Sequence, residues 1–221
     1  MEKQESNKAF LRTYPFAYGG GMMLISATVA TYFSIFMTDT FGIPAAAASI
    51  IMFVATLWDA INDPMMGMIA DRTHNRFGRY RSYYLWVPAV LTFAAFMVFL
   101  APKGLSTPQK IAYIAFFYIL YGMSYTALTM PTVAAVPANT KNDKERNTVI
   151  TLACAIMSLA FCFVSTFTTK LTALTNGSYS PWILLYGAIT IVTFLVLFKT
   201  SKEKYLIPVE KRSIKDDLKR I

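Results

Sequence analysis

The sequence contains little charge and few of the residues that build metal centres or disulfide frameworks. Only 15% of its 221 residues are charged, and it has two cysteines and one histidine. Soluble domains carry about 25% charged residues, so the composition argues against an ordinary cytosolic enzyme, a coiled coil or a disordered chain. Cys154 and Cys162 lie two turns apart in one apolar run, where a disulfide bridge is not expected, and His74 stands alone. We expect neither a disulfide framework nor a zinc-type site.

Long apolar runs, in contrast, are abundant. Hydrophobic residues make up 55% of the chain, and its mean hydropathy is +0.44. A helix that crosses a bilayer needs about 20 mostly apolar residues. Six runs of this kind occupy residues 16–37, 45–70, 83–101, 111–136, 148–169 and 182–198. Because lipid cannot satisfy free backbone groups and no alternating strand pattern is present, the sequence predicts an all-α membrane protein with six transmembrane helices.

The basic residues predict how these helices are oriented. The N-terminal tail 1–15, the loops after the second and fourth spans, and the tail 199–221 together hold 18 lysines and arginines, whereas the other side holds three. The positive-inside rule places the side rich in lysine and arginine in the cytoplasm. We therefore expect a multi-pass protein of the cell membrane with both termini cytoplasmic. Anionic lipid then suffices to explain the net charge of +9, without a nucleic-acid partner.

Two acidic residues, Asp59 and Asp63, lie deep inside the second apolar run. Together with Asn62 they occupy positions i, i+3 and i+4 of a helix, so the three side chains share one face. Two carboxylates and an amide oxygen suit Na⁺, Li⁺ or a proton, and ionisable groups inside a membrane usually mark an ion path or a substrate site. The alternative is that these acids pair with a basic residue on another helix, but no span offers one in its interior. We expect no other metal site and no cofactor.

A second motif follows in the loop between the second and third spans. It consists of Gly67, Asp71, Arg72, Arg76, Gly78, Arg79 and Arg81. This pattern resembles the loop motif of the major facilitator superfamily. The resemblance implies that Gly67 permits close helix contact and that Asp71 and the arginines pair at helix ends, locking one conformation of the transporter. The alternative is a plain basic loop on the cytoplasmic side.

The stretch Trp-Asp-Ala-Ile-Asn-Asp-Pro at 58–64, followed by this loop, is similar to the glycoside–pentoside–hexuronide:cation symporter family. Further matches in order are Thr-Asp-Thr-Phe-Gly at 38–42 and Tyr-Ile-Leu-Tyr-Gly-Met-Ser-Tyr-Thr at 118–126. The resemblance covers nearly the whole chain and implies the N-terminal six-helix half of a major facilitator transporter. Residues 199–221 would then begin the linker to a second half, supplied by the same longer chain or by a second chain.

The resemblance also implies roles for individual residues. Asp59, Asn62, Asp63 and Thr126 match the family's cation ligands, so the coupling site is complete. The sugar clamp of melibiose-type members is not: Met23, Thr129, Cys154 and Val133 stand where acidic, acidic, basic and tryptophan side chains would bind a galactoside. Tyr125 is retained. The candidate substrate contacts are therefore Tyr125, Thr129, Tyr18, Tyr32 and the position of Met23, with packing between helices as the alternative for the tyrosines.

These observations predict cation-coupled symport of a sugar or glycoside, with this chain as the N-terminal half and most simply a fragment. A half that binds a cation or a partner without transporting is the alternative. An enzyme that uses the acids is disfavoured, because the aspartate patterns of CDP-alcohol phosphotransferases and intramembrane aspartyl proteases are absent.

Overall fold

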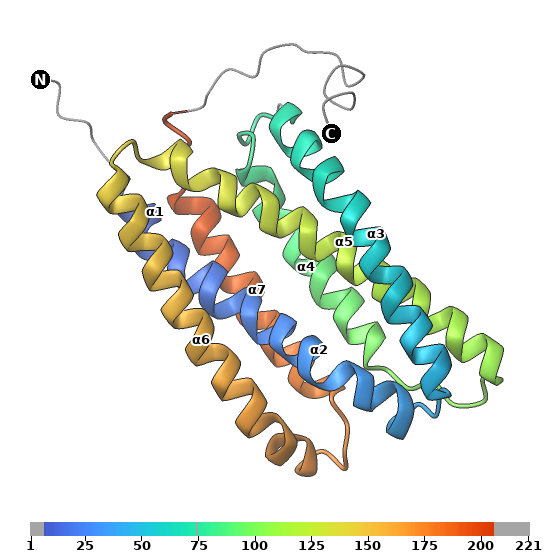
Figure 1. Ribbon diagram of the computed structural model, residues 1–221. Helices are drawn as coiled ribbons and strands as arrows, with labels where there is room; N and C mark the ends of the chain where they lie inside the picture. The colour runs from blue at the N-terminus through green and yellow to red at the C-terminus, as the bar shows by residue number, and fades with distance from the viewer. Residues whose placement is uncertain (1–6, 74, 206–221) are drawn as a thin grey trace, which may run out of the picture.

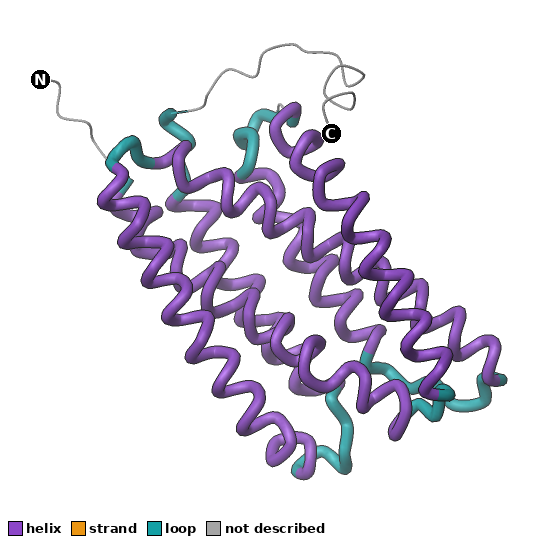
Figure 2. Tube along the Cα trace, in the orientation of Figure 1, coloured by secondary structure: helices purple, strands orange, loops and turns teal. Residues whose placement is uncertain are grey.

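The computed structural model describes residues 7–73 and 75–205, and within these ranges it contains helices and no strands (Figures 1 and 2). Six helical stretches are long and apolar enough to cross a membrane. The first is continuous from Lys8 to Thr40 but not uniform. It comprises α1 (Lys8–Tyr14), a π-helical segment η1 (Pro15–Met22), α2 (Met23–Ile35) and a π-helical end η2 (Phe36–Thr40). The other five are α3 (Ala45–Arg72), α4 (Arg81–Val98), α5 (Thr107–Asn139), α6 (Asp143–Ala173) and α7 (Ser180–Thr200).

Most of these helices are longer than the apolar runs from which they were predicted, because polar caps extend them beyond the apolar region. The side chain of Asn7 accepts from the backbone N–H of Phe10, so the first helix starts well before residue 16. Ser106 and Gln109 form a capping box at the start of α5, and Asn142 caps α6. The exception is α4, which was predicted at residues 83–101 and ends at Val98.

The helices form two groups (Figure 1). In one group, α3 and α4 pack on α5; in the other, the first span packs on α6 and α7, and α4 also contacts α7. The backbone of η1 lies very close to both neighbours in its group. A side chain at Gly19 would collide with the carbonyl oxygen of Ala153, and one at Gly21 with the hydroxyl of Thr193. The hydroxyl of Thr190 donates to the carbonyl oxygen of Gly21 at 2.8 Å. Glycine is therefore required for this helix contact.

Both ends of the described chain meet at one end of the bundle. The backbone N–H of Asn7 donates to the carbonyl oxygen of Asn139, and its side-chain amide donates to that of Thr200. The α3–α4 loop (residues 73–80) and the α5–α6 turn (residues 140–142) lie at the same end, at the top of Figure 1. We call this the basic end, because it carries most of the described arginines.

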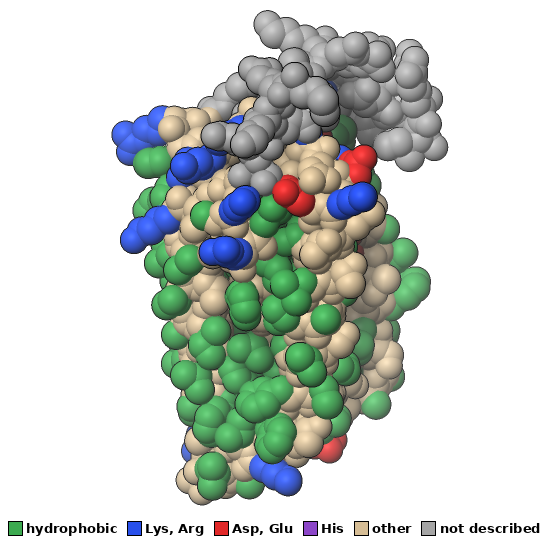
Figure 3. Space-filling view, turned by 90° about the vertical axis from the view of Figure 1, so that its left-hand side faces the viewer, with side chains coloured by type: hydrophobic (Ala, Val, Ile, Leu, Met, Phe, Trp, Pro, Cys, Tyr) green, Lys and Arg blue, Asp and Glu red, His purple; other side chains and the backbone are tan. Residues whose placement is uncertain are grey.

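On the face of the bundle drawn in Figure 3, hydrophobic side chains gather between the two ends. On α3 the exposed large side chains include Ile50, Phe53, Leu57, Ile61 and Ile69, and on α6 they include Leu159, Phe161, Phe163 and Phe167. Lysine and arginine side chains appear above and below this surface in Figure 3. Such an apolar surface bounded by charge is the pattern of a protein embedded in a bilayer.

Candidate functional site: a cation and solute cavity

A cavity of about 350 Å³ lies between α2, α3 and α5. The helix α2 contributes small residues to its wall, α3 contributes both intramembrane aspartates, and α5 contributes a series of tyrosines and threonines. The lining residues are Ser26, Val29, Ala30, Ala55, Trp58, Asp59, Asp63, Tyr118, Ile119, Tyr121, Gly122, Tyr125, Thr126, Thr129 and Met130. No lysine or arginine of the described chain lines the cavity.

The two carboxylates meet α5 at two neighbouring places. The hydroxyl of Thr126 donates to Oδ1 of Asp63 at 2.8 Å. One turn away, a side chain at Gly122 would place its Cβ 3.0 Å from Oδ1 of Asp59, so glycine at this position lets α5 approach the carboxylate without displacing it. Residues separated by four positions on one helix lie on the same face. The aspartates are four residues apart on α3, and Gly122 and Thr126 are four residues apart on α5. Asp59 therefore lies beside Gly122, and Asp63 lies beside Thr126.

Asn62 takes a different position from the two aspartates. It is buried at 3% exposure but is not part of the cavity wall. Its amide nitrogen has no hydrogen-bond partner among residues 7–73 and 75–205, and the same holds for the indole nitrogen of Trp58. The structure therefore brings together Asp59, Asp63 and Thr126, and it places Asn62 on the same helix beside them.

Of the predicted solute contacts, Tyr125 and Thr129 line the cavity. Tyr125 is the last ring of an aromatic ladder along α5: its ring lies 6.1 Å from that of Tyr121, which lies 6.2 Å from that of Tyr118. The ring of Phe33 stacks on Tyr118 at 4.2 Å. Aromatic faces and hydroxyls on one wall are groups that can contact the faces and polar edges of a sugar ring.

The other three predicted contacts lie outside this wall. Tyr32 is 4% exposed and its hydroxyl donates to the carbonyl oxygen of Ser165 at 2.9 Å, so it joins α2 to α6. Tyr18 is half-buried and stacks on Tyr14 at 5.5 Å. Met23 is half-buried, and its sulfur accepts at 3.4 Å from the hydroxyl of Ser26, which does line the cavity.

Two positions that differ from the melibiose-type clamp lie on open surface. Cys154 is exposed on α6 and Val133 is 48% exposed on α5. Neither lines the cavity between α2, α3 and α5.

At the basic end, the structure gives Asp71 a partner other than the expected arginines. The hydroxyl of Tyr80 donates to Oδ1 of Asp71 at 3.0 Å. Burial raises the pKa of Tyr80, which keeps this hydroxyl protonated and able to donate. Arg72 lies in the last turn of α3, and the guanidinium of Arg76 lies 4.6 Å from the ring centroid of Phe77. At Gly67, a side chain would meet nothing within 4 Å, so the close helix contact expected there does not occur among the described residues.

The remaining residues of the loop motif contact the chain that follows α7. Gly78 has a φ of +108°, and Glu203 lies against it. The backbone N–H groups of Arg79 and Arg81 donate to the Glu203 carboxylate, and the side chain of Arg81 donates to the carbonyl oxygen of Phe198. Glu203 is not predictable as a contact from the sequence, because an acid between two lysines in a basic tail is typical of a solvated segment.

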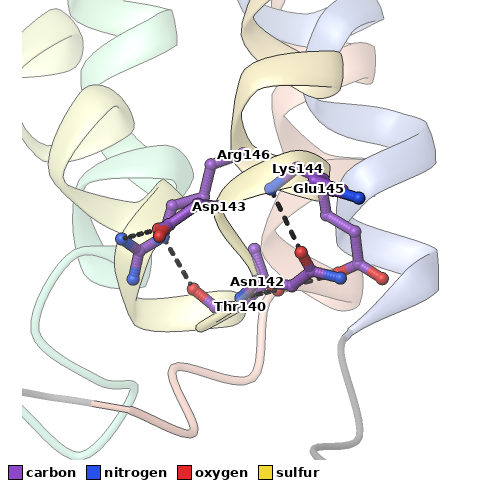
Figure 4. Close-up of polar contacts among 6 residues, drawn as sticks. All are labelled: Thr140, Asn142, Asp143, Lys144, Glu145 and Arg146. Carbon is purple, nitrogen blue, oxygen red and sulfur yellow. Dashed lines mark hydrogen bonds and ion pairs between the residues drawn. The ribbon is translucent and has the colours of Figure 1, made fainter.

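The α5–α6 turn at the basic end is held by a local polar network (Figure 4). Arg146 donates from Nη1 to Oδ1 of Asp143 at 3.2 Å and from Nε to the carbonyl oxygen of Thr140 at 3.0 Å. The hydroxyl of Thr140 donates to Glu145 at 2.8 Å. The acids of the first turn stabilise the start of α6, and the arginine closes the turn.

With this geometry established, comparison with known proteins gives the family. A family profile described as "MFS/sugar transport protein" matches residues 16–216. The chain belongs to this family. It is 33% identical over 195 residues to the isoprimeverose transporter of Lactiplantibacillus pentosus, covering 84% of this chain and 40% of that protein. It is also 33% identical over 199 residues to the uncharacterized symporter YnaJ of Bacillus subtilis, covering 87% and 43%.

A third relative is the putative glycoside/cation symporter YagG of Escherichia coli, 29% identical over 190 residues, with 83% of this chain and 41% of the relative covered. These relatives and the family profile confirm the resemblance inferred from the motifs at 58–81. The family is one of membrane transporters, and the chain shares its helical fold. The chain spans about two fifths of the length of these relatives.

Proposed function

We propose that this chain is the first six-helix half of a symporter that couples a monovalent cation to the movement of a sugar or glycoside. The observation that carries the proposal is the contact of Asp59 and Asp63 with α5, where Thr126 hydrogen-bonds Asp63 inside a cavity. Close carboxylates repel each other when both are ionised. A bound Na⁺ or Li⁺, or a proton, removes this cost, and so the site favours cation binding.

The same cavity supplies the solute contacts. Tyr125 and Thr129 are four residues apart and share one face of α5, and Thr129 lies three residues after Thr126. All three line the cavity, so a solute against Tyr125 and Thr129 lies beside the cation site. A cation that fixes Asp63 and Thr126 also fixes this part of α5. Cation and solute then raise each other's affinity by the same factor, which is the requirement for coupled transport.

In the membrane, the basic end faces the cytoplasm, as the lysine and arginine bias favours. The second wall of the solute site comes from another six-helix half, either the remainder of a longer chain or a separate chain. In such transporters the site lies between two repeats, and access alternates as one repeat moves against the other. One relative is named an isoprimeverose transporter, so isoprimeverose is the first solute to test.

The test measures cation binding to the chain itself in lipid nanodiscs. In a Trp86→Phe, Trp182→Phe background, Trp58 in the cavity wall is the remaining tryptophan and reports on the site. We expect NaCl or LiCl, but not choline chloride at equal ionic strength, to change its fluorescence saturably. Asp63→Asn should abolish the change. Asp39→Asn, which alters an exposed acid that accepts from Thr38, should leave it intact.

A response that survives in Asp63→Asn would refute the cation site. Coupling is tested with the second half present: if isoprimeverose, methyl β-xyloside and methyl β-glucoside then all fail to change the cation affinity, the chain would be a cation-binding half without coupling.

A further inference from the structure

Outside the cavity, a buried carboxylate joins the chain after α7 to the loop before α4. Glu203 is 8% exposed, although acids are rarely buried without partners. Its Oε2 accepts from the backbone N–H of Arg79 at 2.7 Å, and its Oε1 accepts from those of Tyr80 at 2.9 Å and Arg81 at 2.7 Å. One carboxylate thus holds three consecutive backbone donors.

These donors lie at the start of α4, where helix N–H groups have no partner within the helix. A negative charge is also favourable at this end of the helix dipole. Arg81 makes the reciprocal contact: its Nε and Nη2 donate to the carbonyl oxygen of Phe198, in the last turn of α7, at 3.0 and 2.9 Å. Glu203, after α7, therefore caps the start of α4, and Arg81, at the start of α4, caps the end of α7. The negative charge lies at a helix N-terminus and the positive charge at a helix C-terminus, as the helix dipoles favour.

The backbone at this contact adopts conformations that few residues accept. Gly78 has a φ of +108°, and a Cβ there would lie 2.8 Å from Oε2 of Glu203. Glu203 itself has a φ of +44°, a left-handed conformation that costs free energy for a residue other than glycine. The three hydrogen bonds must offset this cost. Loss of the carboxylate removes the three bonds that offset this cost.

From Glu203 a continuous path leads to the helix that carries the two aspartates. Tyr80 donates its backbone N–H to Glu203 and its hydroxyl to Asp71, at 2.9 and 3.0 Å. Asp71 lies in α3, eight residues after Asp63, which is about 12 Å along the helix axis. On the other side, the N–H of Lys202 donates to the side chain of Asn139, at the end of α5.

We propose that Glu203 is a clasp that couples the chain after α7 to the α3–α4 loop and, through Tyr80 and Asp71, to the end of α3. Displacement of residues 201–205 is then transmitted to α3, and displacement of α3 is transmitted to these residues. The loop glycine at position 78 has a specific task in this device, because it makes room for the carboxylate.

Hydrogen exchange of the chain in nanodiscs tests both parts of the proposal. Glu203→Ala should increase amide exchange at residues 79–81 at least about tenfold, since three protecting bonds are lost. It should also increase exchange in the last turn of α3, at residues 70–73. The matched control is Glu145→Ala at the same end, where Glu145 accepts from Thr140; it should change neither segment. Glu203→Gln, which keeps one carbonyl oxygen, should give an intermediate effect and serves if the alanine variant does not fold.

Tyr80→Phe isolates the second step of the path. It keeps the backbone bond to Glu203 and removes the hydroxyl bond to Asp71, so it should affect residues 70–73 and not residues 79–81. The double variant Glu203→Ala, Tyr80→Phe should change residues 70–73 no more than Glu203→Ala does. Unchanged exchange at 79–81 in both Glu203 variants would overturn the clasp. Additive effects at 70–73, or no effect of Glu203→Ala there, would overturn the coupling to α3.

Discussion

Replacing Thr126 by valine removes one hydroxyl from the cavity and leaves the side chain nearly the same size. The hydroxyl donates to Oδ1 of Asp63 at 2.8 Å, and its oxygen keeps lone pairs that a cation between the helices can use. The variant therefore loses the bond to the Asp63 carboxyl group and a candidate ligand at once. Thr126 is 4% exposed, so water does not readily take the place of the hydroxyl.

The expected magnitude follows from the lost oxygen ligand, because the bond to Asp63 is present before the cation binds and does not by itself change the affinity. A polar contact to a charged group contributes about 1.5–3 kcal/mol, and each 1.4 kcal/mol changes a dissociation constant about tenfold. Thr126→Val should thus weaken Na⁺ binding by about 10- to 100-fold. The assay is the Trp58 fluorescence titration in nanodiscs at constant ionic strength. Thr132→Val is the matched control, because Thr132 is a buried threonine of the same helix that donates to the carbonyl oxygen of Leu128 and does not line the cavity.

Two results would refute this reasoning. An unchanged Na⁺ affinity in Thr126→Val, with the protein folded, would mean that the Thr126 hydroxyl contributes nothing to the bound state. An equal loss in Thr132→Val would mean that the effect comes from packing of α5 rather than from the site.

The remaining predictions concern helix contacts. Gly122→Ala places a Cβ 3.0 Å from Oδ1 of Asp59 and must displace this carboxylate by a few tenths of an ångström, so cation affinity should fall several-fold; Gly67→Ala, where nothing lies within 4 Å, should have no effect in the same titration. Tyr32→Phe removes the bond to the carbonyl oxygen of Ser165 and should cost about 1 kcal/mol of stability, seen as a lower melting temperature, while cation affinity stays unchanged. A loss of cation affinity in Tyr32→Phe would instead assign this residue to the site.

The part of the site that lies on one helix could be predicted from the sequence. Asp59 and Asp63 are conspicuous because acids are rare inside apolar runs, and their spacing alone places them on one face. The six spans were also predictable, because the length of an apolar run shows whether a helix can cross the bilayer. Hydropathy does not show where a helix ends outside the apolar region. Asn7 extends the first helix through a cap that lies in the polar tail.

Contacts between helices were harder to predict from the sequence. The role of Thr126 came only from the resemblance to a family. Nothing in the sequence distinguishes Gly122, where a Cβ would lie 3.0 Å from Oδ1 of Asp59, from Gly67, where a Cβ would meet no described residue within 4 Å. The role of Tyr32 is equally ambiguous in the sequence, because a tyrosine in a span can face a solute or join two helices. In the structure its hydroxyl donates to the carbonyl oxygen of Ser165 on α6. Which face a neutral side chain presents depends on where the partner helix lies.

Glu203 shows the limit of sequence reasoning most clearly. Its partners, Arg79 to Arg81, precede it by 122 to 124 residues and use backbone N–H groups, which every residue except proline carries. No side-chain pattern can reveal such a contact. The only local sign is Gly78, and a glycine in a loop has many explanations. The loop motif and the tail, which read as two separate basic segments in the sequence, form one contact in the structure, and the motif glycine provides the space that this contact requires.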